Sequence, residues 1–399
     1  MELYELIAPC HFGLEAVMKR EILDLGYEIE RVEDGKVTFL ADAEGIAYAN
    51  LFLRTTERIL LKVGQVHAET YDELFEATKA LPWEKFIPKN GKFWVTKANS
   101  IKSKLFSPSD IQSIMKKAIV ERLKQVYYME WFPEDGAQYP IRVSILKDEV
   151  LIGLDTSGVS LHKRGYRKLT AKAPITETLA AALIMLTPWK GDRILVDPFC
   201  GSGTFPIEAA MMAADIAPGL NRSFLAEQWT HLVPKKCWMD AAEDARYRIR
   251  NDIETDIQGF DIDGDVIKSA RENAKLAGVE KRCHFEVADV ADFAAKQEAI
   301  VLTNPPYGER MSTIEGAAKL ARTLGRQMEA HPCAGVYAIT ADMDFETHYG
   351  KRANKRRKMY NGMIPCQLYM YYNAPKTEKM AKPMPKSGFD GKRTHFEKK

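Results

Sequence analysis

Hydrophobic and polar positions follow different patterns in the two halves of the chain. From about residue 193 onward, short and continuously apolar segments alternate with segments whose apolar residues recur at helical spacing. The apolar segments lie at 193–196, 257–260, 283–288, 299–302 and 335–340, and the helical ones at 204–215 and 265–278. Strands that are apolar on both faces are typical of a parallel sheet covered by helices. The C-terminal half is therefore predicted to be a doubly wound α/β domain, ending in a hairpin that turns at Asn361 and Gly362.

The N-terminal half shows a mixed pattern in which helices and strands interleave in small units. Strands are predicted at 4–8, 36–41, 58–66 and 92–98, and helices at 14–25, 71–81 and 109–126. Ser109 or Asp110 is expected to cap the last of these helices, and a hairpin is expected to turn at Lys147 and Asp148. The pattern indicates two compact α+β modules with a boundary near residues 55–70.

Composition narrows the class of protein without deciding it. With 399 residues and 46% apolar residues, the chain is long enough for two or three globular domains. Its apolar runs are shorter than the roughly 18 residues of a membrane span, and no basic segment precedes an apolar core at the N-terminus. We therefore expect a cytoplasmic protein without a membrane partner. The six cysteines lie far apart and form no CxxC pair, so no metal is expected.

A glycine-rich turn joins the first strand of the α/β domain to its first helix, in the segment ILVDPFCGSGTFPIEAA at 194–210. Gly201 and Gly203 allow a ligand to approach the backbone, and the helix after Thr204 directs unpaired N–H groups at an anionic group. A dinucleotide fold or a plain tight turn would explain glycines equally well. Asp197 at the strand end argues against a pyrophosphate, which it would repel, and favours S-adenosylmethionine, which carries an ammonium and a sulfonium.

Two further carboxylates follow later strands of the same domain. Asp261 follows the strand 257–260, where it could accept both hydroxyls of a ribose, and Asp289 follows the strand 283–288, where it could accept an adenine amino group. A single Asp in such a position is more often a solvated strand end or a helix cap. Three at successive strand ends predict the edge of one pocket.

The apolar strand 299–302 runs into Asn304, Pro305, Pro306 and Tyr307. The Asn304 amide oxygen and the Pro305 carbonyl can accept both hydrogens of an exocyclic amine, which directs the nitrogen lone pair at a methyl donor without a strong base. The prolines fix φ, and Tyr307 offers a face on which an extruded base can stack. The alternative is a strand broken by prolines at the start of a loop.

The segments DPFCGSGTFPIEAA and NPPYGER together resemble the class I S-adenosylmethionine-dependent methyltransferases that act on exocyclic amines. The segments LHKRGYR, APITETLAAALI and AADIAPG are similar to the THUMP-containing methyltransferases that modify N2 of guanosine in bacterial large-subunit ribosomal RNA, whose members are often labelled N6-adenine DNA methylases. The resemblance covers residues 1–375. It implies a ferredoxin-like segment at 1–65, a THUMP domain at 66–157, a basic linker at 158–173, a Rossmann-like methyltransferase domain at 174–374 and a disordered basic tail at 375–399.

The resemblance also assigns site residues. It implies that cofactor-binding residues are Asp197, Phe199, Gly201, Gly203, Thr204, Asp261, Ile262, Asp289 and Val290, and that Asn304, Pro305, Pro306 and Tyr307 form the catalytic site for the target base. One departure is the gap of 64 positions between Asp197 and Asp261, where about 20 is usual for this unit. The insert at 218–256 is expected to flank the substrate cleft, and it leaves Asp263 as a rival to Asp261.

The nature of the substrate rests on the N-terminal modules and on the basic residues. Small α+β modules with scattered lysines suit the shape of folded RNA better than a DNA major groove, so ribosomal RNA is the expected partner. Lys163, Arg164 and Arg167 are predicted to bind RNA at the junction of the modules, with a solvated linker as the alternative. The basic segment 351–358 is a weaker candidate. An N6-adenine DNA methyltransferase and a non-catalytic RNA-binding assembly factor remain the alternative functions.

Overall fold

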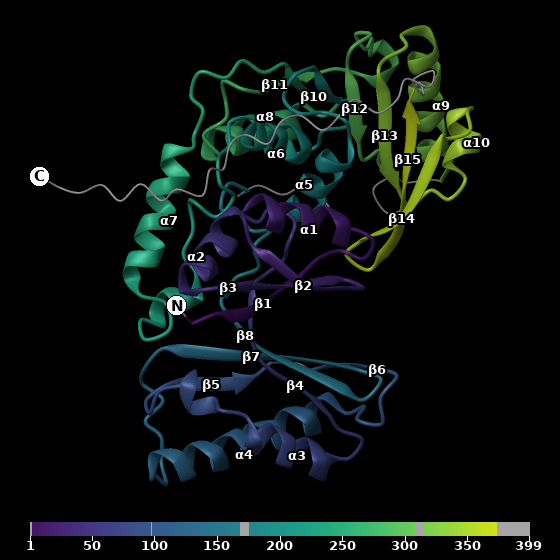
Figure 1. Cartoon of the computed structure of the whole chain (residues 1–399). Helices are drawn as coiled ribbons and strands as arrows, with labels where there is room; N and C mark the ends of the chain where they lie inside the picture. The colour runs from purple at the N-terminus through teal and green to yellow at the C-terminus, as the bar shows by residue number, and fades with distance from the viewer. Residues whose placement is uncertain (1, 97, 168–174, 308–313, 373–399) are drawn as a thin grey trace, which may run out of the picture.

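The computed structural model describes residues 2–96, 98–167, 175–307 and 314–372. Two mixed β-sheets with covering helices organise these residues, one in each half of the chain (Figure 1). The predicted tail at 375–399, the part of the predicted linker after residue 167, and the last three residues of the NPPYGER segment (308–310) lie outside the described residues.

The N-terminal sheet has the strand order β2-β3-β1-β4-β8-β7-β5, with β6 pairing to β7. Its strands are β1 (Tyr4–Pro9), β2 (Glu28–Glu33), β3 (Lys36–Ala41), β4 (Leu60–His67), β5 (Lys92–Val95), β6 (Asn99–Ile101), β7 (Gln138–Leu146) and β8 (Glu149–Asp155). Strand β4 pairs antiparallel with both β1 and β8, so one continuous sheet runs through the two predicted modules. The hairpin between β7 and β8 turns at Lys147 and Asp148 as predicted, and both residues have positive φ.

Four helices accompany this sheet: α1 (Glu15–Asp24), α2 (Ala43–Phe52), α3 (Tyr71–Ala80) and α4 (Pro108–Tyr127). Helix α3 starts at a capping box formed by Thr70 and Glu73. The predicted cap of α4 at Ser109 or Asp110 is wrong by two or three positions, because Ser107 accepts the Asp110 N–H and Pro108 fills the first helical position. Helices α3 and α4 cover one face of the second module (Figure 1).

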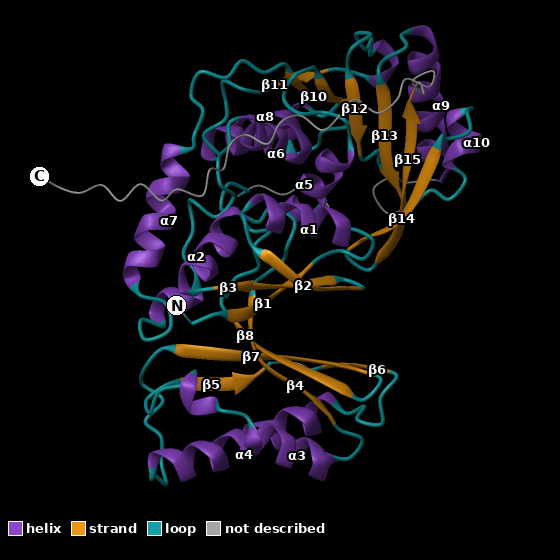
Figure 2. Cartoon of the chain, in the orientation of Figure 1, coloured by secondary structure: helices purple, strands orange, loops and turns teal. Residues whose placement is uncertain are grey.

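The C-terminal sheet has the order β11-β10-β9-β12-β13-β15-β14. Its strands are β9 (Leu195–Asp197), β10 (Ile257–Asp261), β11 (His284–Val287), β12 (Ile300–Thr303), β13 (Gly335–Thr340), β14 (Lys355–Asn361) and β15 (Ile364–Tyr372). Strands β9 to β13 are parallel, and β15 joins antiparallel as the second arm of the predicted hairpin. The doubly wound α/β prediction is confirmed (Figure 2).

Five helices cover the two faces of this sheet: α5 (Glu177–Leu186), α6 (Thr204–Ala213), α8 (Gly264–Leu276), α9 (Ile314–Ala330) and α10 (Phe345–Tyr349). Helix α7 (Lys235–Tyr247) belongs to the insert at 218–256 instead. Helices α5, α6 and α8 share a core with Leu195, Ile300 and Leu302, whereas α9 and α10 share one with Val196 and Val301. Every residue of β12 is buried, as the continuously apolar run predicts. No helix among the described residues is long and apolar enough to span a membrane.

The insert at 218–256 packs against the N-terminal half. Helix α7 lies along α2, and Trp229 is fully buried against Tyr139 with ring centroids 5.0 Å apart. The Trp229 indole N–H also donates to the Gln138 carbonyl over 2.8 Å. Its aromatic residues join the two halves of the protein, and its place beside the substrate cleft stays a prediction.

Candidate active site

Four of the predicted polar residues meet at one edge of the C-terminal sheet. Strands β11, β10, β9 and β12 are neighbours and run parallel, so their carboxyl ends lie side by side. Asp261 ends β10 and Asp197 ends β9, while Asp289 and Asn304 follow β11 and β12. The sequence prediction that successive strand ends share one edge is thus confirmed by the strand order, and ligands bind at this edge in open α/β sheets.

The two glycines of the turn after β9 have different structural requirements. Both adopt positive φ, 52° at Gly201 and 85° at Gly203. A Cβ on Gly203 would lie 2.9 Å from the Phe285 ring, whereas a Cβ on Gly201 would have no atom within 4 Å. Gly203 is therefore fixed by packing at the start of α6, and Gly201 leaves open space beside the backbone of the turn.

Asp197 is a buried carboxylate held by neutral donors. It is 2% exposed and accepts hydrogen bonds from the Thr303 hydroxyl over 2.6 Å and from the Phe199 N–H over 3.1 Å. Burial raises the pKa of Asp197 to about 7, and these hydrogen bonds only partly oppose that rise. Among the described residues, none forms an ion pair with Asp197. A cationic group of a ligand would supply the positive countercharge that Asp197 lacks within the protein.

Asp261 connects the end of β10 to the glycine turn. Its two carboxylate oxygens accept the N–H groups of Gly201 and Asp263, each over 3.0 Å. Burial raises the pKa of Asp261 as well. Asp263 instead caps α8 by accepting the N–H groups of Asp265 and Val266, so the geometry favours Asp261 over Asp263 as the residue that faces the turn. Ile262 between them is 69% exposed and presents an apolar surface beside this edge.

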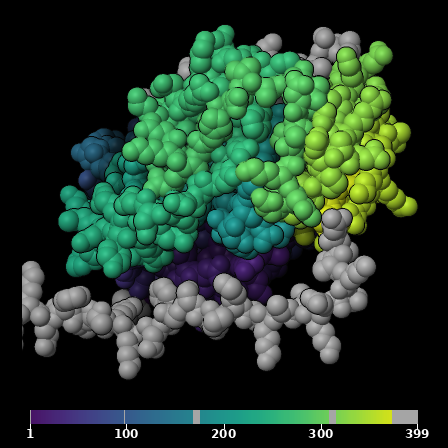
Figure 3. Space-filling view, turned by 90° about the horizontal axis from the view of Figure 1, so that it is seen from above, coloured from purple at the N-terminus to yellow at the C-terminus, as the bar shows by residue number. Residues whose placement is uncertain are grey.

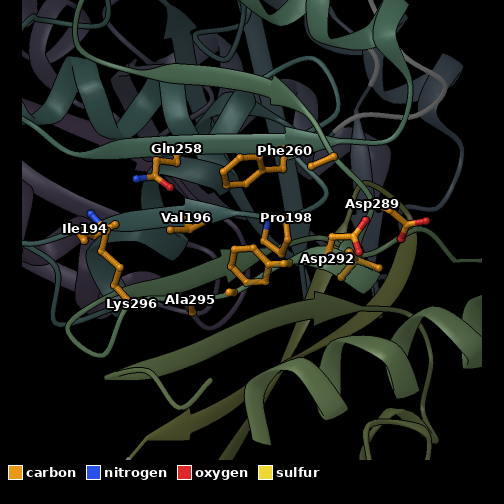
Figure 4. Close-up of a pocket in the computed structure, with 13 residues that line it drawn as sticks. Ile194, Val196, Pro198, Gln258, Phe260, Asp289, Asp292, Ala295 and Lys296 are labelled. Carbon is orange, nitrogen blue, oxygen red and sulfur yellow. The ribbon is translucent and has the colours of Figure 1, made fainter. Parts of the chain in front are cut away.

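Asp289 caps a short 3-10 helix, Val290–Asp292, through a 2.9 Å hydrogen bond from the Ala291 N–H. A cavity of about 250 Å³ opens next to it, as Figure 4 shows. Its walls come from β9 and the residues on either side of it (Ile194, Val196, Pro198), from β10 (Gln258, Phe260) and from most of the segment 288–296. Asp289 and Val290 are the only predicted cofactor residues among those lining this cavity, which is otherwise largely apolar.

The NPPY segment is packed under the terminal hairpin. Asn304 and Tyr307 are 8% and 7% exposed. The Tyr307 hydroxyl accepts a hydrogen bond from the Asn361 amide over 3.3 Å and lies 3.7 Å from the Cys366 sulfur, so it contacts both strands of the hairpin. The expectation of an open Tyr307 face is corrected for this conformation. A base could stack on that ring only after the hairpin or the segment moves.

Of the three predicted RNA-binding residues, Arg164 is buried, Arg167 is partly buried and Lys163 is exposed. Arg164 is 3% exposed, and its guanidinium lies 3.5 Å from the Glu208 carboxylate on α6, which also accepts the Tyr166 hydroxyl over 3.0 Å. Arg167 donates to the Thr204 hydroxyl over 2.8 Å and pairs with Glu177 at 3.3 Å.

These contacts correct the prediction that Arg164 and Arg167 bind RNA, because their guanidinium groups are used to hold the start of α6. The Thr204 hydroxyl, which was expected to face the cofactor, accepts the hydrogen bond from Arg167 instead. Sequence reasoning missed Thr303, Glu208 and Asn361. Of these, only Thr303 had a local signal, since it lies immediately before Asn304 at the end of a buried strand.

A glycine turn after β9, carboxylates at the ends of β9 and β10, and an NPPY segment after β12 define a class I methyltransferase, the class that uses S-adenosylmethionine. Residues 164–370 match the family model described as RMKL-like, methyltransferase domain. Residues 5–60 match the RlmL ferredoxin-like domain, and residues 68–155 match the THUMP domain. The chain therefore belongs to the RMKL-like methyltransferases, with a ferredoxin-like and a THUMP domain before the methyltransferase domain.

Similar proteins agree with this membership. The chain is 45% identical over 376 residues to the Bacillus subtilis (strain 168) protein named "Putative RNA methyltransferase YpsC", covering 94% of this chain and 97% of that protein. It is 33% identical to a "Ribosomal RNA large subunit methyltransferase K/L" from Syntrophotalea carbinolica, covering 89% of this chain and 52% of that protein. The chain thus spans about half the length of that relative. The crystal structure of SMU.472, described as "a putative methyltransferase complexed with SAH", has a TM-score of 0.87 at 40% identity and covers 93% of this chain and 98% of that chain.

Proposed function

We propose that this protein transfers a methyl group from S-adenosylmethionine to N2 of a guanosine in large-subunit ribosomal RNA. The observation that carries the proposal is the shared sheet edge at which Asp197, Asp261 and Asp289 adjoin Asn304. The names of the relatives support RNA as the substrate, and the K/L relative supports the large ribosomal subunit. The THUMP domain supports an RNA partner.

The residues of the edge fit S-adenosylmethionine in charge and in space. Asp197 offers a buried carboxylate to the ammonium of the methionine end, and the open space beside Gly201 admits a ligand close to the backbone. Asp261 keeps further lone pairs for ribose hydroxyls, and the exposed Ile262 can cover an adenine face. Asp289 and Val290 are assigned to the adenine. When bound, this cofactor supplies an electrophilic methyl group.

The chain itself positions the acceptor amine. The side-chain oxygen of Asn304 and the carbonyl of Pro305 accept the two hydrogens of the exocyclic amine, which draws the nitrogen out of conjugation with the ring. Pro305 and Pro306 restrict φ, so these acceptors remain aligned. Orientation and electrostatics of this kind can contribute roughly 7–11 kcal/mol, and no strong base is required. Residues 1–65 and 66–157 are proposed to hold the RNA, and 174–374 to carry out the transfer.

The test is transfer of tritium from labelled S-adenosylmethionine to 23S ribosomal RNA from cells that lack this protein. We expect labelling of that RNA by the full chain, none of double-stranded DNA, and none of RNA already methylated by the wild-type protein. The variant Asn304→Ala should reduce labelling by about 10²–10³-fold, whereas Asn251→Ala, which removes the same amide from an exposed loop, should not. Labelling of DNA alone would favour an adenine N6 methyltransferase, and labelling of neither would favour the non-catalytic alternative.

A further inference from the structure

A second cavity lies where the ferredoxin-like domain meets the methyltransferase domain. It has a volume of about 420 Å³ and lies between α1, the ends of α5 and α6, and strand β14. Figure 1 shows α1 beside α5 and the lower part of β14, and Figure 3 shows purple N-terminal residues next to the methyltransferase half on one face. The volume falls within the range of small-molecule sites, about 300–1,000 Å³. None of its lining residues belongs to the sheet edge described above.

The lining combines an apolar floor with an excess of positive charge. Met185, Leu186 and Met212 contribute apolar surface, while Arg20, Lys190 and Arg357 contribute three cations against one carboxylate, Asp24. Each cation comes from a separate part of the chain, namely α1, the loop before β9, and β14. An apolar surface beside clustered cations is suited to a ligand with a flat apolar part and an anionic part.

The positive charges are only partly balanced within the protein, by Asp24 and Asp192 near Lys190. Among the described residues, Arg20, Lys190 and Arg357 form no ion pair, and the Nη1 atom of Arg357 is buried without a hydrogen-bond partner. Partial burial lowers the pKa of Lys190, the nearby charge of Arg20 lowers it further, and Asp192 and Asp24 oppose the shift only in part. Buried donors in native proteins usually have a partner, so the Arg357 guanidinium keeps hydrogen-bonding capacity beside this cavity.

The position of Arg357 on β14 also shows how far the cavity lies from residues 304–307, which are proposed to bind the target base. Burial alternates along β14, so that Arg357, Met359 and Asn361 share the face turned toward the core, while Arg356 and Lys358 are exposed on the opposite face. Asn361 contacts the Tyr307 hydroxyl. Four residues of extended strand span roughly 13 Å, so the cavity lies about that far along β14 from the segment that handles the target base.

We infer that this cavity binds a nucleotide, with its phosphate on Arg20, Lys190 and Arg357 and its base against the apolar floor. The nucleotide is either one unit of the RNA substrate near the target guanosine or a free mononucleotide, since both present the same chemistry. For the RNA unit, the inference rests on the proposed RNA substrate and adds to it a contact between the RNA and the junction of the two domains. Within the basic segment 351–358, Arg357 is then the residue that binds a phosphate.

The test measures binding of the full chain to an unmethylated 23S ribosomal RNA transcript at several KCl concentrations, without a methyl donor. Arg357→Gln and Lys190→Gln should each weaken binding at low salt by about tenfold, the scale of one charge-assisted contact. They should also reduce the slope of log affinity against log salt by about 0.7, the value for one phosphate on a single strand. Lys275→Gln removes the same charge from an exposed position on α8, outside this cavity and the basic segment 351–358, and should change both quantities little.

Calorimetric titration with guanosine 5′-monophosphate distinguishes the two sources. If Lys190→Gln and Arg357→Gln lose mononucleotide binding but keep wild-type affinity for RNA, the occupant is a free nucleotide. If both variants bind RNA and the mononucleotide as the wild type does, the inference is overturned. Lys190 lies in an exposed loop, so its variant decides the question even if Arg357→Gln fails to fold. Because no methyl transfer is measured, failure of the proposed function would not affect this outcome.

Discussion

Substituting alanine for each glycine of the turn after β9 should separate folding from cofactor binding. Both residues have positive φ, and holding an L-residue there costs about 1–2 kcal/mol. Gly203→Ala also drives a methyl group to 2.9 Å from the Phe285 ring and 3.1 Å from the Ala270 Cβ. Overpacking of this kind adds about 1–3 kcal/mol. We therefore expect Gly203→Ala to lower the free energy of unfolding by about 2–5 kcal/mol, and Gly201→Ala by about 1–2 kcal/mol.

Cofactor binding should show the opposite order. Relative to the stability that each variant loses, Gly201→Ala should lose more cofactor affinity than Gly203→Ala. The methyl group of Gly201→Ala meets no protein atom within 4 Å and instead occupies the open space beside the turn. We expect this variant to remain folded and to bind the cofactor analogue sinefungin at least tenfold more weakly, a loss of about 1.4 kcal/mol.

Urea denaturation followed by circular dichroism gives the stabilities, and calorimetric titration gives the affinities. Gly191→Ala, which also has positive φ and ordinary contacts far from the sheet edge, is a matched control that should lose stability without losing affinity. Equal stabilities of the Gly201 and Gly203 variants would refute the packing argument. Wild-type sinefungin affinity of Gly201→Ala would refute the placement of the cofactor.

Further predictions concern the acceptor, the carboxylates and the domain junction. Asn304→Ala should reduce turnover by about 10²–10³-fold with unchanged sinefungin affinity, since it removes a positioned acceptor, whereas Asp261→Ala should weaken sinefungin binding first. Tritium transfer measures turnover and calorimetry measures sinefungin affinity. Near-normal turnover of Asn304→Ala would contradict the account. Burial raises the pKa of Asp197 from 3.8 to about 7, so its contribution to stability is complete below about pH 4 and is lost as the pH rises through about 7. Asp197→Asn should flatten that loss in urea denaturation, and the wild type should bind sinefungin more tightly at pH 8 than at pH 6, because only the ionised carboxylate attracts the ammonium. Glu208→Gln removes the carboxylate that pairs with the buried Arg164 guanidinium and should cost about 3–5 kcal/mol of unfolding free energy. A loss below about 1 kcal/mol would show that this ion pair does not hold the junction.

Sequence predicted the parts of the site whose signals are local. The strands that precede Asp197, Asp261 and Asn304 are short apolar runs, and the turn glycines have a backbone requirement that no other residue meets without strain. The alternation of strands and helices also predicted correctly that these residues lie at one edge of the sheet, because parallel strands place their carboxyl ends together. These features depend on residues within a few positions of one another, so one sequence is sufficient to find them.

The features that sequence missed depend on partners far away in the chain. Arg164 looks like a surface cation beside Lys163, and only the fold brings Glu208 to its side, 44 positions later. Tyr307 looks like an open stacking surface, yet the terminal hairpin covers it through a contact with Asn361, 54 positions later. Nothing in the sequence next to a basic or aromatic residue indicates such a distant partner. Burial of a charge or a ring is therefore the least predictable property of this site.

The central claim is that the sheet edge brings a methyl donor to the N2 amine of a guanosine in ribosomal RNA. Its most direct test is mass spectrometry of nucleosides from 23S ribosomal RNA of a deletion strain, before and after incubation with the full chain and S-adenosylmethionine. The account predicts that N2-methylguanosine increases and that Asn304→Ala prevents the increase. An increase in N6-methyladenosine instead, or no new methylated nucleoside with a protein that still binds sinefungin, would contradict it.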